Sequence, residues 1–394
     1  MLCAPISYHS QSISVVVIAL LGLILIPLPP CRILCSNRDE FLARPALAAA
    51  FHSFGDANSD SPSNSNSQSS PPRAGDATVL SGRDTQAGGT WLGLTPGTGR
   101  VALLTNITEP YQSLPSSRGS LAPAFLLGKP RTPLETLYPQ GSYAGFNLLV
   151  LEAEWEASSS SAPPQPTASA SISVSPRLHF PHAFLVSNGG AGGQLLSRPL
   201  RAEERTSGGL SNGLHVTETG GEAWPKVAQG RTLFSDTVKA HDEALRRDDA
   251  RDADAALAGR LFALLRTAAA EPVRAREELR RTICVRPLEI SAKPRPDVNN
   301  AQTPDSSASA VPATINGTGT PIPSTPTIYG TRTASVLLVR RSGDALFVER
   351  DVWRLKPGGV ELYEGGAIGG TGSGKLAGEE DGERVFRVRV GAQG

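Results

Sequence analysis

The sequence predicts an α+β domain, with one core of strands and a few helices that is interrupted by insertions. Short apolar runs of strand length alternate with turn residues through most of the 394 residues. One later segment instead has leucines at helical spacing. Between these blocks lie stretches rich in Ser, Pro, Asn and Gly, which bury too little apolar surface to offset the entropy of the chain.

The strand predictions rest on apolar runs bounded by turn residues. The first two runs flank Pro96–Gly99 and the last two flank Ser342–Gly343, so each pair is expected to form a hairpin. The predicted strands are 90–94, 100–105, 143–153, 182–187, 336–339 and 345–349.

Three helices are predicted. Ser120–Leu127 is the shortest, and Trp224–Val238 opens with Pro225, a residue suited to the first helical turn. The strongest pattern covers about Ala240–Leu265, where an apolar stripe follows the helical period. The stripe consists of Leu257, Leu261, Leu264 and Leu265.

Four low-complexity spacers are predicted to be loop insertions or tails without a core. They cover 55–76, 156–176, 291–327 and 357–384. We therefore predict one domain over 31–356, an apolar N-terminal segment of uncertain role over 1–30, and a Gly-rich tail over 357–394.

Composition excludes some classes of function. The formal net charge is +1 and no basic stripe is interleaved with aromatics, so nucleic acid is not an expected partner. The four cysteines have neither a disulfide framework nor paired metal-ligand spacing. They are Cys3, Cys31, Cys35 and Cys284. We expect reduced thiols, no metal and no cofactor.

The segment Ile33–Pro45 contains the most informative motif. A short apolar run leads into Asn37, Arg38, Asp39 and Glu40, which offer an amide, a guanidinium and two carboxylates at the end of a predicted strand. Such a run indicates either a solvated turn or part of a binding or active site. The second alternative applies because such sites are often assembled where strands lead into loops.

Further blocks accompany this motif in a fixed order. They are Val79–Asp84, Gly88–Gly93, Gly99–Asn106 with Glu109-Pro110, Ser117–Gly119, Gly145–Leu149, Ser187-Asn188, Gly209–Asn212, Trp224–Val227, Tyr329–Thr333, Val336–Val339 and Phe347–Arg350. Together with the motif they span about residues 33–353 and resemble the Asn-Arg-Asp-Glu (NRDE) family, the transport and Golgi organisation protein 2 family.

The resemblance implies a four-layer αββα sandwich similar to the N-terminal-nucleophile hydrolases. It also implies a role in Golgi organisation, protein secretion and lipid or haem handling, in the cytoplasm with association to the Golgi and endoplasmic reticulum or to mitochondria. We expect a trafficking factor that binds a small amphipathic ligand, an acyl lipid or haem, rather than a classical enzyme. Membrane association is a weaker expectation.

The alternative is an N-terminal-nucleophile amidohydrolase that attacks a C–N bond. In that class the first residue is the nucleophile and its own amino group is the base. Family members begin Met-Cys, whereas this chain begins Met1-Leu2-Cys3, and a bulky residue after Met prevents its removal. Cys3 or Cys31 is therefore a catalytic candidate only if processing or a different start exposes it as the N-terminus.

The apolar run Ile13–Ile26 has three interpretations. Its fourteen residues are too few for an ordinary membrane span. It resembles a signal h-region, but no Lys or Arg precedes it and no small-x-small site follows. It is a signal anchor or cleaved signal, which implies a secretory location, or it is the buried first strand that the family has near this place.

The expected ligand-binding residues are Asn37, Arg38, Asp39, Glu40, Arg83, Asp84, Thr90 and Asn106. In the related hydrolases an Arg and an Asp after the first strand orient the nucleophile, and Arg38 and Asp39 match them in kind. Gly88-Gly89 allows the backbone to approach a ligand closely. A buried polar network that fixes the sheet corners explains the same residues equally well.

Three other motifs are weak. Gly209–Gly213 has the form G-x-S-x-G, but the segment before Ser211 is polar and Gly-rich and predicts no strand. Gly369–Lys375 approaches a phosphate-binding loop, although Leu376 stands where Ser or Thr is needed. His179 and His182 lack a third metal ligand.

Overall fold

The structure is a computed structural model that describes residues 14–20, 30–54, 79–110, 112, 114–129, 131–132, 134–138, 142–156, 176–214, 224–247, 252–290, 328–356, 359–362 and 382–391. For 14–20, 30–31 and 135 it describes the backbone alone. The predicted insertions at 55–76, 156–176 and 291–327 lie almost entirely outside the described residues.

The first of two large antiparallel sheets has seven strands in the order β10-β1-β2-β12-β13-β16, with β11 paired to β12. Its strands are β1 (Ser14–Leu20), β2 (Pro30–Phe41), β10 (Gly208–Leu210), β11 (Leu288–Glu289), β12 (Ile328–Arg340), β13 (Asp344–Asp351) and β16 (Glu383–Arg389). The central strands β2 and β12 have the most extensive pairing, from Tyr329 opposite Phe41 to Arg340 opposite Pro30.

The second sheet has seven strands that follow one another in chain order. They are β3 (Ala46–His52), β4 (Val79–Asp84), β5 (Leu92–Thr95), β6 (Arg100–Asn106), β7 (Phe146–Trp155), β8 (Leu178–Ser187) and β9 (Leu196–Pro199). A separate hairpin joins β14 (Trp353–Lys356) to β15 (Gly359–Leu362).

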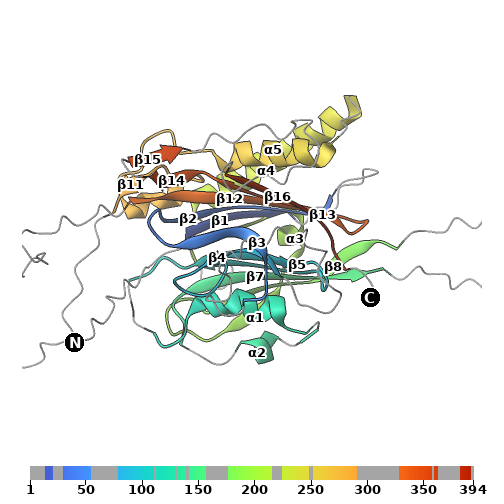
Figure 1. Ribbon diagram of the computed structural model, residues 1–394, viewed down its shortest axis with the longest axis horizontal. Coiled ribbons are helices and arrows are strands. Elements are labelled where there is room, and N and C mark those ends of the chain that lie inside the picture. The colour runs from blue at the N-terminus through green and yellow to red at the C-terminus, as the bar shows by residue number, and fades with distance from the viewer. Residues whose placement is uncertain are drawn as a thin grey trace, which may run out of the picture.

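The helices are α1 (Leu121–Leu127), α2 (Leu134–Leu137), α3 (Ala202–Ser207), α4 (Pro225–Arg247) and α5 (Ala253–Leu265), with 3-10 turns η1 (Arg118–Ser120) and η2 (Arg276–Arg281). α4 and α5 cover the outer face of the first sheet, and α1 and α2 cover part of the second (Figure 1). The result is four layers, helix–sheet–sheet–helix, as predicted.

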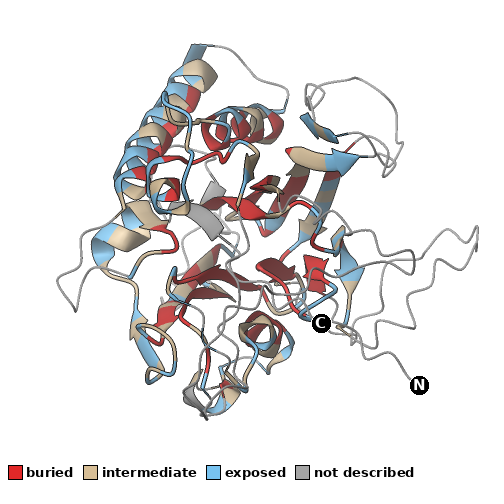
Figure 2. Cartoon of the chain, turned by 90° about the vertical axis from the view of Figure 1, so that its left-hand side faces the viewer, coloured by how far each residue is buried: buried red, intermediate tan, exposed pale blue. Residues whose placement is uncertain are grey.

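Alternation along β2 divides the core. Leu34 belongs to the cluster between the sheets, together with Leu80 and Leu337. Its neighbours Ile33 and Cys35 belong to the cluster beneath α4 and α5. Successive side chains of a strand point to opposite faces, so β2 contributes to both layers. The buried residues follow the strands and the inward sides of the helices (Figure 2).

Both predicted hairpins are present. β5 pairs with β6 around a turn in which Gly99 has φ of +65°, and β12 pairs with β13 around Gly343, with φ of +86°. These positive φ values favour glycine at the two turns. The helices predicted at 120–127 and from Pro225 are also present.

The single helix predicted over 240–265 is wrong, because α4 ends at Arg247 and α5 begins at Ala253. Asp252 has non-helical angles, φ −136° and ψ 79°, and its side chain accepts a hydrogen bond from the backbone N–H of Ala255. This cap starts a new helix. The leucine stripe lies wholly within α5 and is buried.

The two ends of the chain contribute more strands than the sequence suggested. β1 comes from the apolar N-terminal segment and pairs antiparallel with β2, which agrees with the first-strand interpretation. β15 and β16 come from the region predicted as a Gly-rich tail, and β16 pairs with β13 over seven residues. No helix in the described part of the chain has the length and apolarity required to cross a membrane.

Candidate ligand-binding site

The motif Asn37–Glu40 lies inside β2 rather than in a loop. All four residues are at most 1% exposed, so the interpretation as a solvated turn is wrong. The strand continues to Phe41 because β1 pairs with one of its edges and β12 with the other. This pairing satisfies the hydrogen-bonding groups of the backbone. The polar side chains are therefore carried into the interior.

Strand alternation separates the motif into two pairs. Arg38 and Glu40 point to the space between the sheets, where Arg38 meets Trp91 of the second sheet. Asn37 and Asp39 point to the helix layer. The Asn37 Nδ2 group donates to the carbonyl of Leu265 at 2.8 Å and to that of Ile283 at 3.0 Å. The four residues therefore do not line one surface.

Arg38 has a distinctive environment. Its guanidinium carbon lies 3.9 Å from the centroid of the Trp91 ring, in stacking contact. Its Nε and Nη2 atoms are buried and have no hydrogen-bond partner among the described residues. Burial lowers the pKa of Arg38 to about 10, with Glu40 opposing the shift, so the side chain stays charged at neutral pH. Within the described part of the chain, two buried donors of this cation therefore lack an acceptor.

Three more arginines act electrostatically on Glu40. Glu40 is fully buried, and its Oε2 lies 3.6 Å from Arg44 Nε. It also interacts electrostatically with Arg118, at the start of η1, and with Arg332 of β12. We call the four arginines that interact with Glu40 the arginine cluster, which consists of Arg38, Arg44, Arg118 and Arg332.

The four cations of the arginine cluster meet more than one carboxylate. Arg44 holds Asp84 at 2.7 Å. Arg118 also interacts electrostatically with Glu109, and Arg332 with Asp351, so four carboxylates act on four arginines and the formal charges cancel. Burial raises the pKa of Glu40 to about 7, although the arginines oppose this.

The members of the arginine cluster differ in whether their N–H donors have hydrogen-bond acceptors. Arg44 donates to Asp84 and to the side chain of Gln86, and Arg118 donates to the carbonyl of Gly145 at 2.8 Å. Arg332 donates to the carbonyl of Arg44. Arg38 is the member whose buried Nε and Nη2 find no acceptor among the described residues, and it is the least exposed of the four.

Gly82 and Gly89 allow close packing around Trp91 and the neighbouring backbone. A Cβ on Gly82 would lie 2.5 Å from Cζ2 of Trp91, so the absence of a side chain lets the indole pack there. A Cβ on Gly89 would lie 1.9 Å from the carbonyl oxygen of Gly119. The close approach at Gly89 is therefore to the backbone of Gly119, and not to a ligand as predicted.

The helix-facing pair forms a second polar centre. Asp39 accepts a hydrogen bond from Thr331 Oγ1 at 2.6 Å, and its other carboxylate oxygen has no partner among the described residues. Burial raises the pKa of Asp39 to about 6, while Lys226 opposes the shift. Lys226 of α4 is fully buried, and burial lowers its pKa to about 8.

The other predicted site residues are buried but separate. Arg83 lies 5.9 Å from the ring of Phe54, and Thr90 donates to the carbonyl of Leu92. The carbonyl of Asn106 accepts from Nδ2 of Asn212 at 2.7 Å. Of the eight predicted residues, only Arg38, Glu40 and Asp84 meet at the arginine cluster. Ligand contact by any of the eight stays a prediction.

Sequence reasoning missed Arg44, Arg118, Arg332 and Lys226 as site residues. Each of them stands in a block that was already noted for its resemblance to the family. The available signal was one cation in each of four separated blocks. Only the fold brings the arginines to one carboxylate.

The segment after β10 differs from its prediction. β10 directly precedes Ser211, so the inference that no strand comes before this serine is wrong. The strand forms at the sheet edge because β1 offers pairing partners. The nucleophile-elbow pattern is still incomplete, since α4 begins only at Pro225.

The remaining candidate residues do not form a metal site or a catalytic group within the described part of the chain. The described residues contain no group of three or more potential metal ligands, and His182 pairs with Glu154 at 3.0 Å. Cys35 and Cys284 are buried free thiols. Cys3 and the Gly369–Lys375 segment lie outside the described residues.

Fold and site together define a four-layer α+β protein with a buried, arginine-rich polar centre between its sheets. Residues 32–354 match the Transport and Golgi organisation 2 family, and the chain belongs to that family. Membership implies a role in transport and Golgi organisation. No curated protein was found to match the chain.

Proposed function

We propose that this protein binds the acidic group of a small amphipathic ligand at the arginine cluster, and that it serves transport and Golgi organisation as a carrier or sensor of that ligand. The observation that carries the proposal is Arg38. Its Nε and Nη2 are buried without an acceptor among the described residues. An unmatched donor on a buried cation is costly, and a ligand acceptor removes that cost.

The chemistry of Arg38 favours an anion. Arg38 is a buried cation with two N–H donors that have no acceptor among the described residues. A carboxylate or phosphate presents two or more oxygens to a guanidinium fork, which is the pairing that arginine makes best. The indole of Trp91 holds the guanidinium plane from one side and leaves its edge for such a group.

The expected ligands, an acyl lipid or haem, both carry acid groups on an apolar body. Exposed apolar side chains occur on β3, which begins two residues after Arg44. Leu47 is 49% exposed and Phe51 is 41% exposed. These side chains offer contact to the apolar part of a ligand whose acid group reaches the cluster. Lipid or haem homeostasis and support of secretion follow as the proposed physiological roles.

The test is a thermal-shift series with oleate, methyl oleate and haemin. Oleate and methyl oleate share the acyl chain, but the ester lacks the negative charge. We expect oleate and haemin to raise the melting temperature and methyl oleate to have little effect. Arg38→Gln is expected to abolish the oleate shift, Arg38→Lys to retain part of it, and Arg247→Gln, at a guanidinium 80% exposed, to leave it unchanged. An oleate shift that persists in Arg38→Gln contradicts the proposed site.

A second candidate function, amide hydrolysis by an N-terminal nucleophile, is favoured by one observation. In the pairing of β1 with β2, Ser14 is opposite Asp39 and Val15 is opposite Arg38. A mature chain that began at Ser14 would hold both a hydroxyl-bearing residue and a free amino group beside the motif. Cys31 does not suit this role, because it is seven residues from Arg38 along β2, about 23 Å at about 3.3 Å per residue.

N-terminal sequencing of the native protein separates the two candidates. A mature chain that starts at Ser14, or at a cysteine next to the motif, supports the hydrolase. A mature chain that retains residues before Ser14 rules out that serine as an N-terminal nucleophile and leaves ligand binding as the function.

A further inference from the structure

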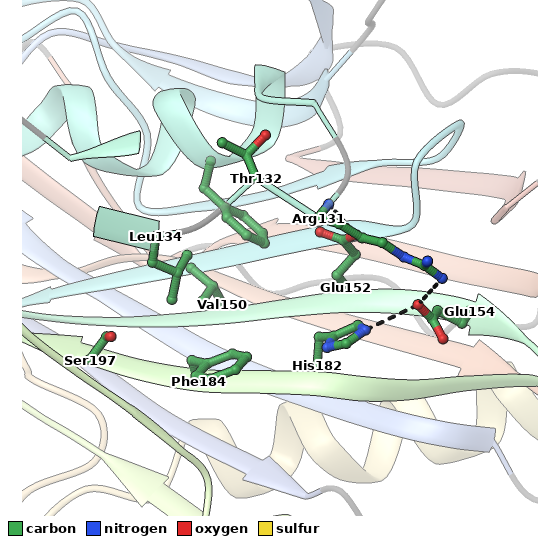
Figure 3. A pocket seen from close by; sticks show the side chains of 10 residues that line it. Arg131, Thr132, Leu134, Val150, Glu152, Glu154, His182, Phe184 and Ser197 are labelled. Carbon is green, nitrogen blue, oxygen red and sulfur yellow. Dashed lines mark hydrogen bonds and ion pairs between the residues drawn. The ribbon is translucent and has the colours of Figure 1, made fainter. Parts of the chain in front are cut away.

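A groove crosses the outer face of the second sheet, on the side away from the arginine cluster. It has a volume of about 570 Å³, which is within the range of small-molecule sites. Its floor comes from β7, β8 and β9, and α1 with Arg131, Thr132 and Leu134 forms its upper wall (Figure 3). The helices α1 and α2 cover only part of this sheet, which leaves the groove beside them.

One end of the groove is apolar. Leu134, Val150 and Phe184 line it from α2, β7 and β8 (Figure 3), and Phe125 of α1 also lines the groove. Phe125 and Val150 are buried in the core beneath, whereas Leu134 and Phe184 remain half-buried. Two aromatic rings and two aliphatic groups suit a flat or elongated apolar body.

The other end is polar, but its charges are already paired. Arg131 Nη2 donates to Glu154 Oε1 at 2.7 Å, and His182 Nε2 lies 3.0 Å from the same oxygen. Partial burial acts to raise the pKa of Glu154, but these hydrogen bonds outweigh it and hold the pKa below its usual value. Glu152 is saturated by Arg100 and by the backbone N–H of Arg131. Arg131, Glu152 and Glu154, the arginine and the carboxylates that line this end, therefore each have an oppositely charged partner.

Two acceptors remain open at this end, beside the exposed guanidinium of Arg131. Both donors use Oε1 of Glu154, so its Oε2 receives no hydrogen bond from the described residues. When His182 donates through Nε2 to the carboxylate, the Nδ1 of the neutral ring is an acceptor. A ligand that fits this end brings a hydrogen-bond donor without a charge.

We propose that this groove is a second binding site, for an uncharged apolar molecule with one N–H or O–H donor, of the arylamine, indole, phenol or fatty-alcohol class. The donor lies against Glu154 and His182, and the apolar body lies along Phe184, Val150 and Leu134. The site differs in chemistry from the arginine cluster, which selects an anion. It goes beyond the function proposed above and does not depend on it.

The test uses two fluorescent probes with the same aromatic body. N-phenyl-1-naphthylamine is uncharged and has one N–H, and 8-anilinonaphthalene-1-sulfonate adds a negative charge. Titration of the full chain is expected to give saturable binding of the uncharged probe and at least tenfold weaker binding of the sulfonate. Equal affinities for the two probes would overturn the assignment of ligand class.

Variants then locate the site. Ser197→Trp fills the groove from an exposed position, and Phe184→Asp removes an apolar wall. Each is expected to weaken binding of the uncharged probe at least tenfold. His182→Phe removes an acceptor and is expected to weaken binding of this probe about threefold to tenfold. His182→Gln retains an acceptor and is expected to restore part of the affinity. The matched control is Leu355→Ser, at an exposed leucine on β14 outside the groove. Binding that survives Ser197→Trp in a protein with an unchanged melting temperature overturns the site.

Discussion

Arg38 of β2 and Trp91, which directly precedes β5, join the two sheets through a stacked contact, with the guanidinium carbon 3.9 Å from the ring centroid. Both side chains are at most 2% exposed. The contact supplies a π-face to a buried cation whose Nε and Nη2 have no hydrogen-bond acceptor among the described residues. It therefore holds the guanidinium in place without saturating it, as a preformed anion site requires.

Replacement of Trp91 tests the packing side of this relationship. Trp91→Ala removes the largest fully buried side chain of the inter-sheet core and is expected to lower the free energy of unfolding by about 3–5 kcal/mol. Trp91→Phe keeps an aromatic face and is expected to cost less than half as much. Urea denaturation measures both, and equal losses in the two variants would mean that stacking on Arg38 contributes nothing.

Gly82→Ala tests why the indole lies where it does. The added Cβ would come within 2.5 Å of Trp91, so the ring must shift and about 1–3 kcal/mol of stability is expected to be lost. The near-ultraviolet circular dichroism of the tryptophans is expected to change as well. Gly97→Ala is the control, because a Cβ there meets nothing within 4 Å. Similar stability losses at both positions would contradict the steric explanation.

The buried Lys226 predicts a pH dependence of stability. Burial lowers the pKa of Lys226 from 10.5 to about 8 in the folded protein. Between these values the unfolded chain holds a proton that the folded protein has released, so the free energy of unfolding rises with pH across the window. Asp39, with a pKa raised to about 6, stays ionised throughout and adds no slope of its own.

Lys226→Met removes this slope. Relative to the wild type, the free energy of unfolding of the variant is expected to fall by about 3 kcal/mol from pH 8 to pH 10.5, since one pKa unit corresponds to about 1.4 kcal/mol. Lys239→Met, an exposed position on the same helix, is the control. A difference between Lys226→Met and wild type that does not vary with pH would show that the amine is not desolvated.

Asn147 of β7 connects the second sheet to the end of β10. Its Nδ2 lies 3.2 Å from the carbonyl oxygen of Ser211 and 3.1 Å from that of Gly213. Asn147→Asp keeps the shape but removes the donor, so buried carbonyls face a carboxylate. We expect a loss of about 2–3 kcal/mol and faster amide exchange in β10. Unchanged exchange in β10 would mean that this link does not hold the strand.

The sequence predicted the fold well where local pattern and packing agree. The four leucines of α5 have helical spacing and are buried, and both hairpins have the turn glycines that their φ values favour. The break between α4 and α5 was missed because helix propensity is high on both sides of it. The Asp252 cap decides the boundary, and capping residues are also common inside helices.

The site was less predictable. Four polar residues in a row normally indicate a loop, and only pairing on both edges of β2 makes them interior. The alternation that then separates Arg38 from Asp39 follows at once from the strand geometry. The interactions of Arg118 and Arg332 with Glu40 are two long-range relationships of the fold, which no local pattern encodes.

The most direct test of ligand binding by the motif is isothermal titration calorimetry with laurate on the wild type and on Arg38→Gln. The wild type is expected to bind laurate at a single site, and Arg38→Gln to bind it at least tenfold more weakly, a loss of about 1.4 kcal/mol or more. Arg247→Gln serves as the charge-matched control. Equal laurate affinities for the wild type and Arg38→Gln, with both proteins folded, would contradict the assignment of the acid group to Arg38.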